Sequence, residues 1–435
     1  MFDVVVVGAG VAGSIAAREC REAGLDVHLL EARDRVGGRL SAIDAAPGVA
    51  LEVGGEFYRP WATPVLAAEL ERYGIATGPA YVCEQQLVVD GDGLHDLAAE
   101  FAADPGALRS LVETVRREAR RMSDPDAARE LDAERIDEAL EALTLPPRIK
   151  IWFRCWIEQY AGTSLSNISV ANMLKLVKGS GGSLRSAAPV SGRHLLPDTR
   201  TFTERLAASV IADTTFGVAV TRIERRADGT GFEVHANERT WTARSVIVAV
   251  PRNVLAAGDI ELDLDWAGEA PAALREAQPG LGYKMWARLD SSAPIRTAVL
   301  GELGGFRLLC TTERQPDGST WAVLFGSAAT LGDRADDLDR EVRSAVASTW
   351  GASVEVLEVR GHDWVADPFA RGAWTTAPVQ DEDPIADLLG RLPAGLAFAG
   401  ADFSSERGGV ESALKSGMSA AAHVRTTVED PERTR

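Results

Sequence analysis

The chain has 435 residues, of which 46% are hydrophobic and 25% are charged, as is ordinary for a globular protein. That length suffices for two or three domains with a sizeable core. The formal net charge of −18 disfavours binding to nucleic acid or to an anionic membrane surface, and mainly favours solubility.

Cysteine and histidine usage excludes two further classes. The four cysteines form no CxxC pair, and the six histidines have no metal-ligand spacing. We therefore expect no disulfide framework, no metal site and a reducing compartment. No apolar run reaches the ~18 residues of a membrane span, and the chain starts directly on a strand pattern without a leader. These features predict a soluble cytoplasmic protein.

The first elements in chain order form a βαβ unit. Phe2–Val7 is an apolar, β-branched run that predicts a buried parallel strand. A GAGVAG turn and a helical pattern that stops at Gly24 follow, and Val27–Leu30 predicts the second strand, with Glu31 at its end. Glycines that serve only a tight turn would not explain that acid, so we predict a dinucleotide-binding unit.

Each residue of this unit has a defined role in binding a dinucleotide. Gly8 permits the tight turn, Gly10 lets the backbone approach a pyrophosphate, and Gly13 lets helix and strand pack closely. The helix N-terminus offers N–H groups and a positive dipole end to the phosphates. Glu31 would accept hydrogen bonds from the adenosine ribose, and an acid there disfavours a 2′-phosphate.

A second glycine pair follows at once, in EARDRVGGR (31–39), and a third in LEVGG (51–55). Together with the GxGxxG unit, these stretches resemble the flavin-containing amine oxidases. The resemblance implies non-covalent FAD, with Arg33 and Arg39 along the pyrophosphate and ribityl chain, although surface charge is the alternative for both arginines. The residues expected to bind FAD are Gly8, Gly10, Val11, Ala12, Gly13, Glu31, Ala32, Arg33, Gly38, Arg39, Gly54, Gly55, Glu56, Val220, Gly400, Asp402, Gly409 and Val410.

The resemblance runs nearly end to end and implies an α/β fold: a Rossmann-like FAD-binding domain with an inserted α+β substrate domain. The FAD-binding domain would be discontinuous (1–75, 191–260 and 386–435), and the substrate domain would comprise 76–190 and 261–385. Strands are predicted at 2–7, 27–30, 218–223, 231–242 (a hairpin), 245–251, 283–289, 306–310, 321–326, 354–360 and 397–399. Helices are predicted at 105–122, 134–142, 147–160, 169–178 and 336–349, with a long helix after 402 whose N-terminus faces the flavin.

Two residues are expected to act in catalysis. Lys284 lies in the apolar strand GYKMW, where a buried lysine is costly without a partner or a task. The resemblance implies a lysine hydrogen-bonded through water to flavin N5, and the alternative is an exposed edge-strand lysine. Trp374 matches the stretch that supplies one wall of an aromatic cage over the flavin. Ala373 stands where some relatives carry the cysteine that links to FAD, which implies a non-covalent cofactor.

Gly409 departs from the family pattern, because many relatives carry an aromatic second cage wall there. Either the pocket admits a bulkier substrate or another side chain fills the gap, with Trp156, Tyr160 and Phe57 as candidates. Tyr58 and Gln159 complete the predicted substrate pocket, with Glu158 as the alternative to Gln159.

The stretch GGEFYR (54–59) bears on the substrate. L-amino-acid oxidases of this superfamily hold the substrate carboxylate with an arginine, and Phe57 occupies that position here. Arg59 would share a strand face with Phe57 and weakens this exclusion. Glu56 is expected either to attract a cationic amine or to form a hydrogen bond within the fold.

The resemblance implies oxidation of a C–N bond to an imine by hydride transfer to flavin N5, with O2 reduced to H2O2. The finer likeness is to the bacterial 6-hydroxy-L-nicotine oxidase branch, which indicates a small secondary or cyclic amine. The alternatives are an L-amino-acid oxidase, a biosynthetic C–N dehydrogenase for a bulkier amine, and a flavin-binding protein without turnover. A homodimer stays open as the assembly.

Overall fold

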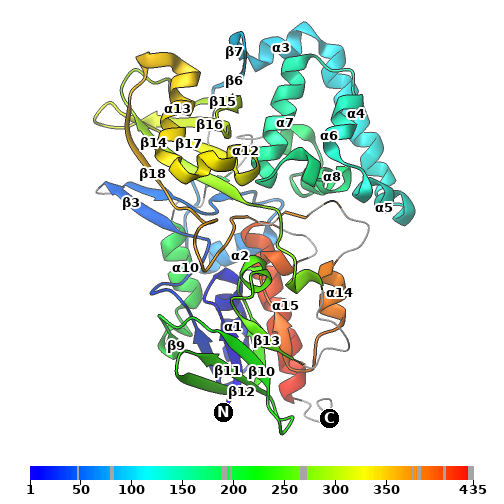
Figure 1. Ribbon diagram of the computed structural model, residues 1–435, viewed down its shortest axis with the longest axis vertical. Coiled ribbons are helices and arrows are strands. Elements are labelled where there is room, and N and C mark those ends of the chain that lie inside the picture. Colours follow the sequence, from blue (N-terminus) through cyan, green and yellow to red (C-terminus); the bar gives the residue numbers. More distant parts are fainter. Residues whose placement is uncertain are drawn as a thin grey trace.

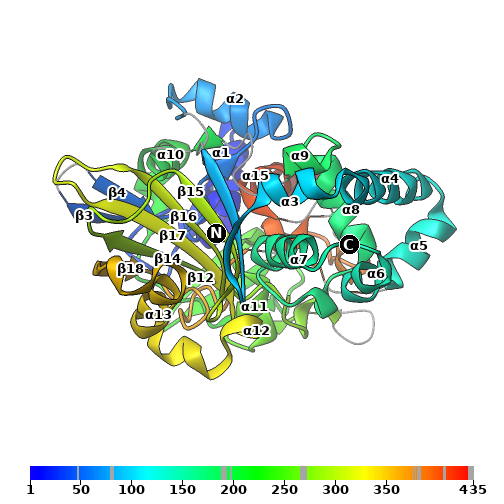
Figure 2. The same ribbon diagram turned by 90° about the horizontal axis from the view of Figure 1, so that it is seen from above.

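The computed structural model describes residues 1–46, 49–78, 83–187, 194–195, 198–264, 272–374, 376–377, 379, 384–404 and 408–429. Figure 1 shows two layers, one above the other along the long axis. Segments from the start, middle and end of the chain (blue, green and red) share the lower layer. The upper layer holds the yellow strands with cyan and green helices beside them, which Figure 2 shows from above.

The lower layer is built on an eight-stranded sheet in the order β13-β10-β11-β12-β1-β2-β9, with β19 also paired to β12. Its strands are β1 (Phe2–Val7), β2 (Val27–Leu30), β9 (Thr214–Thr215), β10 (Arg222–Arg225), β11 (Phe232–Ala236), β12 (Arg239–Val248), β13 (Glu261–Asp263) and β19 (Leu396–Phe398). β1 runs parallel to β2 and β12. Val4, Val5 and Val6 are fully buried, as a strand covered on both faces requires.

Two helices pack closely on this sheet. α1 (Val11–Glu22) connects β1 to β2, and α15 (Gly409–Glu429) packs along α1. The contact depends on glycine at two positions: a Cβ on Gly13 would lie 1.9 Å from the Gly8 carbonyl oxygen, and one on Gly417 would lie 2.3 Å from the Ala12 carbonyl oxygen. The smaller helices of this layer are α2 (Pro64–Arg72), α10 (Thr199–Ala207), α11 (Arg252–Ala256) and α14 (Pro384–Gly390).

The upper layer is built on a seven-stranded sheet in the order β18-β14-β17-β16-β15-β6-β7. Its strands are β6 (Gln85–Asp90), β7 (Gly93–Asp96), β14 (Gly282–Leu289), β15 (Thr297–Leu303), β16 (Phe306–Arg314), β17 (Thr320–Ser327) and β18 (Val356–Gly361). One face packs on α13 (Leu338–Trp350), and α12 (Ala328–Leu331) follows β17. The other face packs on α7 (Pro147–Ala161), with which it forms one continuous core.

The helical part of the upper layer lies beside this sheet. Its helices are α3 (Leu97–Ala103), α4 (Pro105–Arg121), α5 (Pro125–Ala133), α6 (Ile136–Ala142), α7 (Pro147–Ala161), α8 (Val170–Gly179) and α9 (Leu184–Ala187). Two short pairs, β3 (Ala42–Ala46) with β4 (Val49–Glu52) and β5 (Phe57–Tyr58) with β8 (His194–Leu195), complete the strands.

The predicted α/β class is confirmed, and the predicted helices at 105–122, 134–142, 147–160 and 169–178 correspond to α4, α6, α7 and α8. Three details differ. The strand predicted at 218–223 begins only at Arg222, and residues 239–248 form one continuous strand instead of two separate ones. β13, at residues 261–263, pairs in parallel with β10 and extends the lower sheet.

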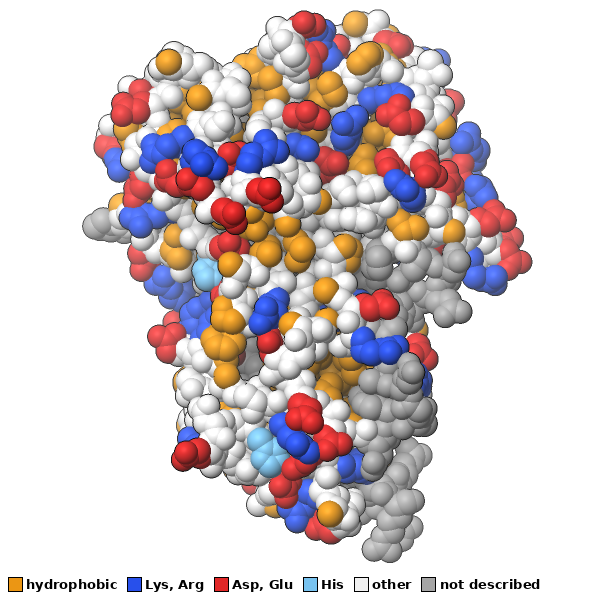
Figure 3. Space-filling model, in the orientation of Figure 1, with side chains coloured by type: hydrophobic (Ala, Val, Ile, Leu, Met, Phe, Trp, Pro, Cys, Tyr) orange, Lys and Arg blue, Asp and Glu red, His pale blue; other side chains and the backbone are white. Residues whose placement is uncertain are grey.

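Acidic and basic side chains lie interspersed on the face shown in Figure 3, without a large patch of one sign. Among the described residues, no helix combines the length and the apolar character needed to cross a membrane.

Candidate active site

A cavity of about 1280 Å³ is lined by segments of both layers. This volume exceeds the ~300–1,000 Å³ of a typical small-molecule pocket, so a dinucleotide and a second small molecule could share it. The lower layer contributes the turns after β1, β2 and β12 and the start of α15. The upper layer contributes Lys284 on β14, Phe325 on β17 and the ends of α7 and α8.

The turn between β1 and α1 forms one wall of the cavity. Gly8 has a φ of 101°, and Gly10 precedes α1 as its N-cap without offering a side chain. The second glycine pair packs directly onto this turn: the Gly37 amide donates to the Ala9 carbonyl at 2.8 Å, and a Cβ on Gly38 would lie 3.1 Å from the Gly10 Cα. The exposed backbone N–H groups at the helix N-terminus suit a pyrophosphate.

Glu31 closes the same wall at the end of β2. Its carboxylate accepts hydrogen bonds from the Ala9 amide at 2.7 Å and the Arg33 amide at 2.8 Å. The side chain is buried and lines the cavity. Two backbone donors thus fix an acid where the ribose of a dinucleotide would lie, and the residues present fit FAD.

The two predicted FAD-binding arginines are held by acids. Arg33 pairs with Asp367 at 2.6 Å, and Arg39 pairs with Asp402 at 3.0 Å while donating to the Ala373 carbonyl at 2.6 Å. Burial alone would raise the pKa of Asp367, but hydrogen bonds from Arg33, the Phe369 amide and His362 keep that pKa below its usual value. Both arginines line the cavity, so they are not ordinary surface charges.

The segment between β4 and β5 is fixed by three side-chain donors on consecutive carbonyls. Trp286 Nε1 donates to Glu52 O at 3.0 Å, Trp364 Nε1 to Val53 O at 2.9 Å, and Lys284 Nζ to Gly54 O at 3.2 Å. These hydrogen bonds thereby fix the backbone at Gly54 and Gly55, both of which line the cavity.

Lys284 is 2% exposed, and its Nζ lies 2.9 Å from Glu56 Oε1. The ammonium also lies 5.8 Å from the centroid of the Phe57 ring and 5.5 Å from that of Trp286. An exposed edge-strand position is therefore wrong for this lysine, since β14 lies between β17 and β18. Glu56 forms an ion pair with this lysine within the fold.

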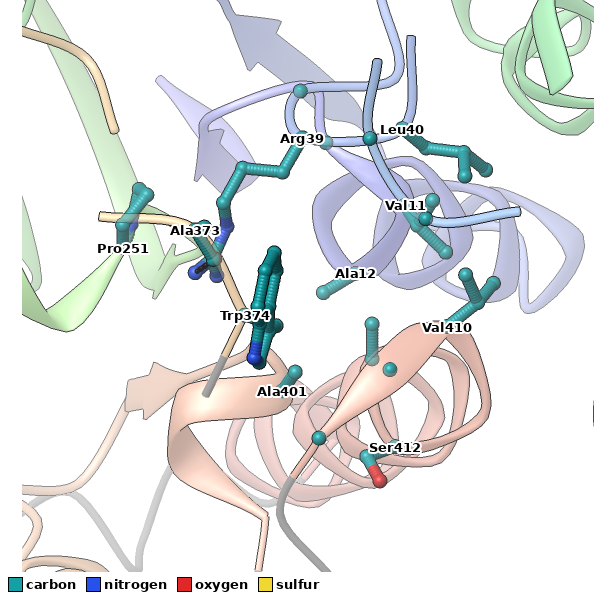
Figure 4. Close-up of a pocket in the computed structure, with 18 of the residues that line it drawn as sticks. Val11, Ala12, Arg39, Leu40, Pro251, Ala373, Trp374, Ala401, Val410 and Ser412 are labelled. Carbon is teal, nitrogen blue, oxygen red and sulfur yellow. Dashed lines mark hydrogen bonds between the residues drawn. The ribbon is translucent and has the colours of Figure 1, made fainter. Parts of the chain in front are cut away.

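Aromatic rings line the part of the cavity near Lys284. Phe57 and Phe325 have centroids 6.3 Å apart, and Phe325 meets Trp374 edge to face at 6.4 Å. Trp374 fits between two glycines: a Cβ on Gly162 would lie 2.9 Å from its ring, and one on Gly282 would lie 2.2 Å away. Figure 4 shows this indole inside the cavity, beside Ala373 and Ala401.

The start of α15 faces the start of α1 across the cavity, as Figure 4 shows for Val410 and Ser412 opposite Val11 and Ala12. Gly409 has a φ of 75°, and a Cβ built there would meet nothing within 4 Å. Among the described residues, no atom therefore fills the space where a side chain at Gly409 would begin.

Three predicted site residues lie elsewhere. Trp156 is fully buried between Trp152 and Phe153, because only the last turn of α7 reaches the cavity. Gly13 and Asp402 lie behind the lining: Gly13 serves the packing of α1, and Asp402 holds Arg39.

The remaining predicted residues line the one cavity, including Phe57, Tyr58, Gln159, Tyr160, Val220 and Gly400. Glu158, the alternative to Gln159, faces away and pairs with Arg307 at 2.7 Å. Sequence reasoning missed Phe325 and Ser412. Phe325 lies in β17, where every residue is buried, so no alternation marks the cavity side.

A dinucleotide cradle, two acid-held arginines, a buried lysine and a row of aromatic rings therefore meet in one cavity, which defines a flavin-dependent oxidoreductase site. The family model for flavin containing amine oxidoreductases matches residues 11–425. The chain belongs to this family, and it is an FAD-dependent oxidoreductase that acts on amine donors.

Two curated relatives and one solved structure are similar to this chain over nearly its whole length. Nicotine dehydrogenase of Pseudomonas putida (strain DSM 28022 / S16) is 27% identical over 98% of this chain and 88% of the relative. (S)-6-Hydroxynicotine oxidase of Paenarthrobacter nicotinovorans is 27% identical over 95% of this chain and 97% of the relative. Cyclohexylamine oxidase from Brevibacterium oxydans IH-35A shares the fold, with a TM-score of 0.80 at 21% identity, and the match covers 99% and 100% of the two chains.

Proposed function

We propose that this protein oxidises a C–N bond of a small secondary or cyclic amine to an imine, with O2 as the acceptor and H2O2 as the second product. The observation that carries the proposal is the meeting of a dinucleotide cradle with Lys284, Phe57, Phe325 and Trp374 in one cavity. In this account the layer built on the eight-stranded sheet holds the cofactor, and the upper layer supplies most of the substrate side.

In this proposal FAD would lie along the lower wall of the cavity. The β1–α1 turn and the N-terminus of α15 would hold its phosphates and flavin end, and Glu31 would hold its ribose. When bound, FAD supplies hydride acceptance from the substrate carbon and electron transfer to the acceptor. Ala373 offers no thiol, which supports a non-covalent cofactor.

The protein's own contribution is position, exclusion of water and electrostatics. Phe57, Phe325 and Trp374 offer apolar faces that would orient a neutral amine and keep water away. Lys284, fixed by Glu56 and the Gly54 carbonyl, would hold a water or a proton beside the reacting centre. The described lining offers no unpaired acid beside Lys284 that could serve as a strong base, and none is needed if the amine arrives neutral.

Gln159 supports a substrate with a polar group on its ring. The side chain is 5% exposed and lines the cavity, and its Oε1 has no hydrogen-bond partner among the described residues. A buried amide without a partner costs free energy, so a ligand that supplies one would be favoured. Two curated relatives carry names that refer to nicotine compounds, which contain a cyclic amine.

A bulkier natural-product amine is the alternative that the open space beside Gly409 favours. An α-amino acid is disfavoured at the position of Phe57, which has no charge to offer a carboxylate.

The experiment that tests the proposal is product analysis under air. The FAD-loaded enzyme would be incubated with cyclic and N-methyl amines including 6-hydroxynicotine, primary amines, polyamines and L-amino acids. We expect equal amounts of H2O2 and of a product two hydrogen atoms lighter, or its hydrolysis product, from the cyclic or N-methyl class. Turnover confined to L-amino acids, or no turnover with any class, would overturn the proposed substrate.

A further inference from the structure

We infer that the amine substrate carries an anionic group, of the carboxylate class, at the end remote from the oxidised C–N bond, and that Arg59 binds it. This inference rests on the proposed function and adds to it the chemical class of the substrate. It concerns a residue that lines the cavity and whose guanidinium Nε and Nη2 have no hydrogen-bond partner among the described residues.

Arg59 is a partly buried cation for which the described residues offer no counter-ion. Its Nε and Nη2 are both buried, and neither has a hydrogen-bond partner in the described part of the chain. Burial lowers the pKa of Arg59, and the neighbouring Tyr160 offsets this only in part. A buried guanidinium is costly to leave unpaired, whereas a carboxylate matches its two parallel N–H groups.

The acids around the cavity do not compensate this charge, because each already has a donor. Glu31 accepts two backbone amides, Glu56 pairs with Lys284, and Asp132 accepts the Ser169 hydroxyl. Asp259 pairs with Arg371, and Glu411 accepts the Leu66 amide and pairs with Lys415. The described acids of the lining therefore leave Arg59 to a ligand.

Arg59 lies beside a more exposed part of the cavity lining than Lys284 does. Its neighbour Tyr160, at the end of α7, is 39% exposed, whereas Lys284 is 2% exposed. Lys175 and Lys178 of α8 also line the cavity, and both are exposed. In a chain of net charge −18, these three cations in the lining of one cavity would attract the anionic end of a substrate, and the amine would lie toward the buried Lys284.

The test compares matched amines with and without a carboxylate: hexylamine against ε-aminocaproate, piperidine against isonipecotate, and L-leucine as the α-amino acid. Anaerobic bleaching of the bound flavin gives the reduction rate at each concentration. We expect the remote carboxylates to be preferred in wild type, and Arg59→Met to lower their kcat/KM by about 10- to 100-fold while leaving the parent amines unchanged.

Two further variants keep the result interpretable. Arg59→Lys retains the charge without the fork and should recover part of the preference. Arg154→Met removes the same charge from an exposed position on α7 outside the cavity lining, and should change nothing. Equal rates for both members of each pair in wild type, a preference for L-leucine, or loss of FAD from Arg59→Met would each overturn the inference.

A binding measurement separates this inference from the proposed function. Hexanoate and hexanol would be titrated into the FAD-loaded enzyme, with the flavin absorbance spectrum as the readout. If no amine is oxidised but hexanoate alone binds, and Arg59→Met abolishes that binding, the proposed function fails while the anion site stands. If hexanoate fails to bind and amines are oxidised without regard to charge, the anion site fails while the function stands.

Discussion

At the scale of single residues, the buried ion pair between Lys284 and Glu56 links the two layers. The lysine comes from β14 of the upper sheet, and the glutamate follows the glycine pair of residues 54–55. Both side chains are nearly inaccessible, at 3% and 4% exposure, so each needs the other. The pair thus holds a charge beside the aromatic row.

Replacing Lys284 with Met should slow flavin reduction or reoxidation by about 100-fold, because a fixed donor at the reacting centre is lost. FAD should remain bound. Stopped-flow absorbance of each half-reaction is the measurement. The single variant leaves Glu56 buried without its partner, so the double variant Lys284→Met/Glu56→Gln removes both charges, and Lys150→Met on α7 removes a lysine at a distance from the cavity. Unchanged rates of both half-reactions in the double variant would contradict a role for Lys284.

Glu52 gives the stability of the protein a pH dependence. Burial raises the pKa of its carboxyl, against the hydrogen bonds from Thr199. Because the folded state holds this proton more tightly than the unfolded chain, where the pKa is about 4.3, stability is lost as pH rises from there through the raised folded pKa.

The variant Glu52→Gln removes this titration. In urea unfolding of the FAD-loaded protein across that pH range, the wild-type free energy of unfolding should fall relative to the variant, by at most ~1.4 kcal/mol per pH unit. A difference between the two proteins that is constant with pH, or that grows in favour of wild type as pH rises, would contradict the assignment.

At the scale of elements, the packing of α15 on α1 positions both helix N-termini at the cavity. Gly417 makes this approach possible, because its missing side chain admits the Ala12 carbonyl. The two helices therefore need a close contact within the lower layer to bring backbone donors to the same ligand.

Replacing Gly417 with Ala should destabilise the protein by about 1–3 kcal/mol, although alanine favours helix by ~1 kcal/mol over glycine. It should also weaken FAD binding, since Ala12 lines the cavity. Thermal unfolding and FAD titration measure both effects. The control is Ser419→Ala on the exposed face of α15, and a Gly417→Ala protein as stable as this control would contradict the packing argument.

Elements with a strong local pattern could be predicted from the sequence. The β1–α1–β2 unit combines an apolar run, spaced glycines and an acid, and the helices α4, α6, α7 and α8 have clear apolar periodicity. The extent of β10 and the continuity of β12 depend on which strand lies alongside, and so does the place of β13 in the lower sheet. Such pairings join residues far apart in the chain, so the local sequence pattern does not predict them.

In the candidate site, too, residues of local motifs could be predicted from the sequence, and contacts between distant segments could not. Gly8, Glu31 and Gly38 belong to local motifs, and they line the cavity as predicted. Trp156 is one of three aromatic candidates for the gap beside Gly409, but a tryptophan packs equally well in a core, and the rotation and depth of α7 decide between the two. The partners of Lys284 and Arg39 come from distant segments, so only the fold could identify them.

At the scale of the whole molecule, the cavity lies between two layers that each have a hydrophobic core of their own. The lower sheet and the upper sheet have hydrophobic clusters of their own, and strands β4 and β5 pass between them. Chain segments 1–75 and 386–429 contribute to one wall, and β14, β17, α7 and α8 to the other. Binding of FAD should therefore stabilise both layers together.

The measurement that tests the central claim most directly is anaerobic titration of the purified protein, with its bound FAD, by the amine panel. The account predicts that a cyclic or N-methyl amine, or its carboxylate-bearing analogue, bleaches the visible absorbance of the flavin stoichiometrically in the absence of oxygen. It also predicts that acid precipitation releases the flavin into solution. A protein that fails to retain FAD, or a flavin that stays oxidised with every amine, would contradict the account.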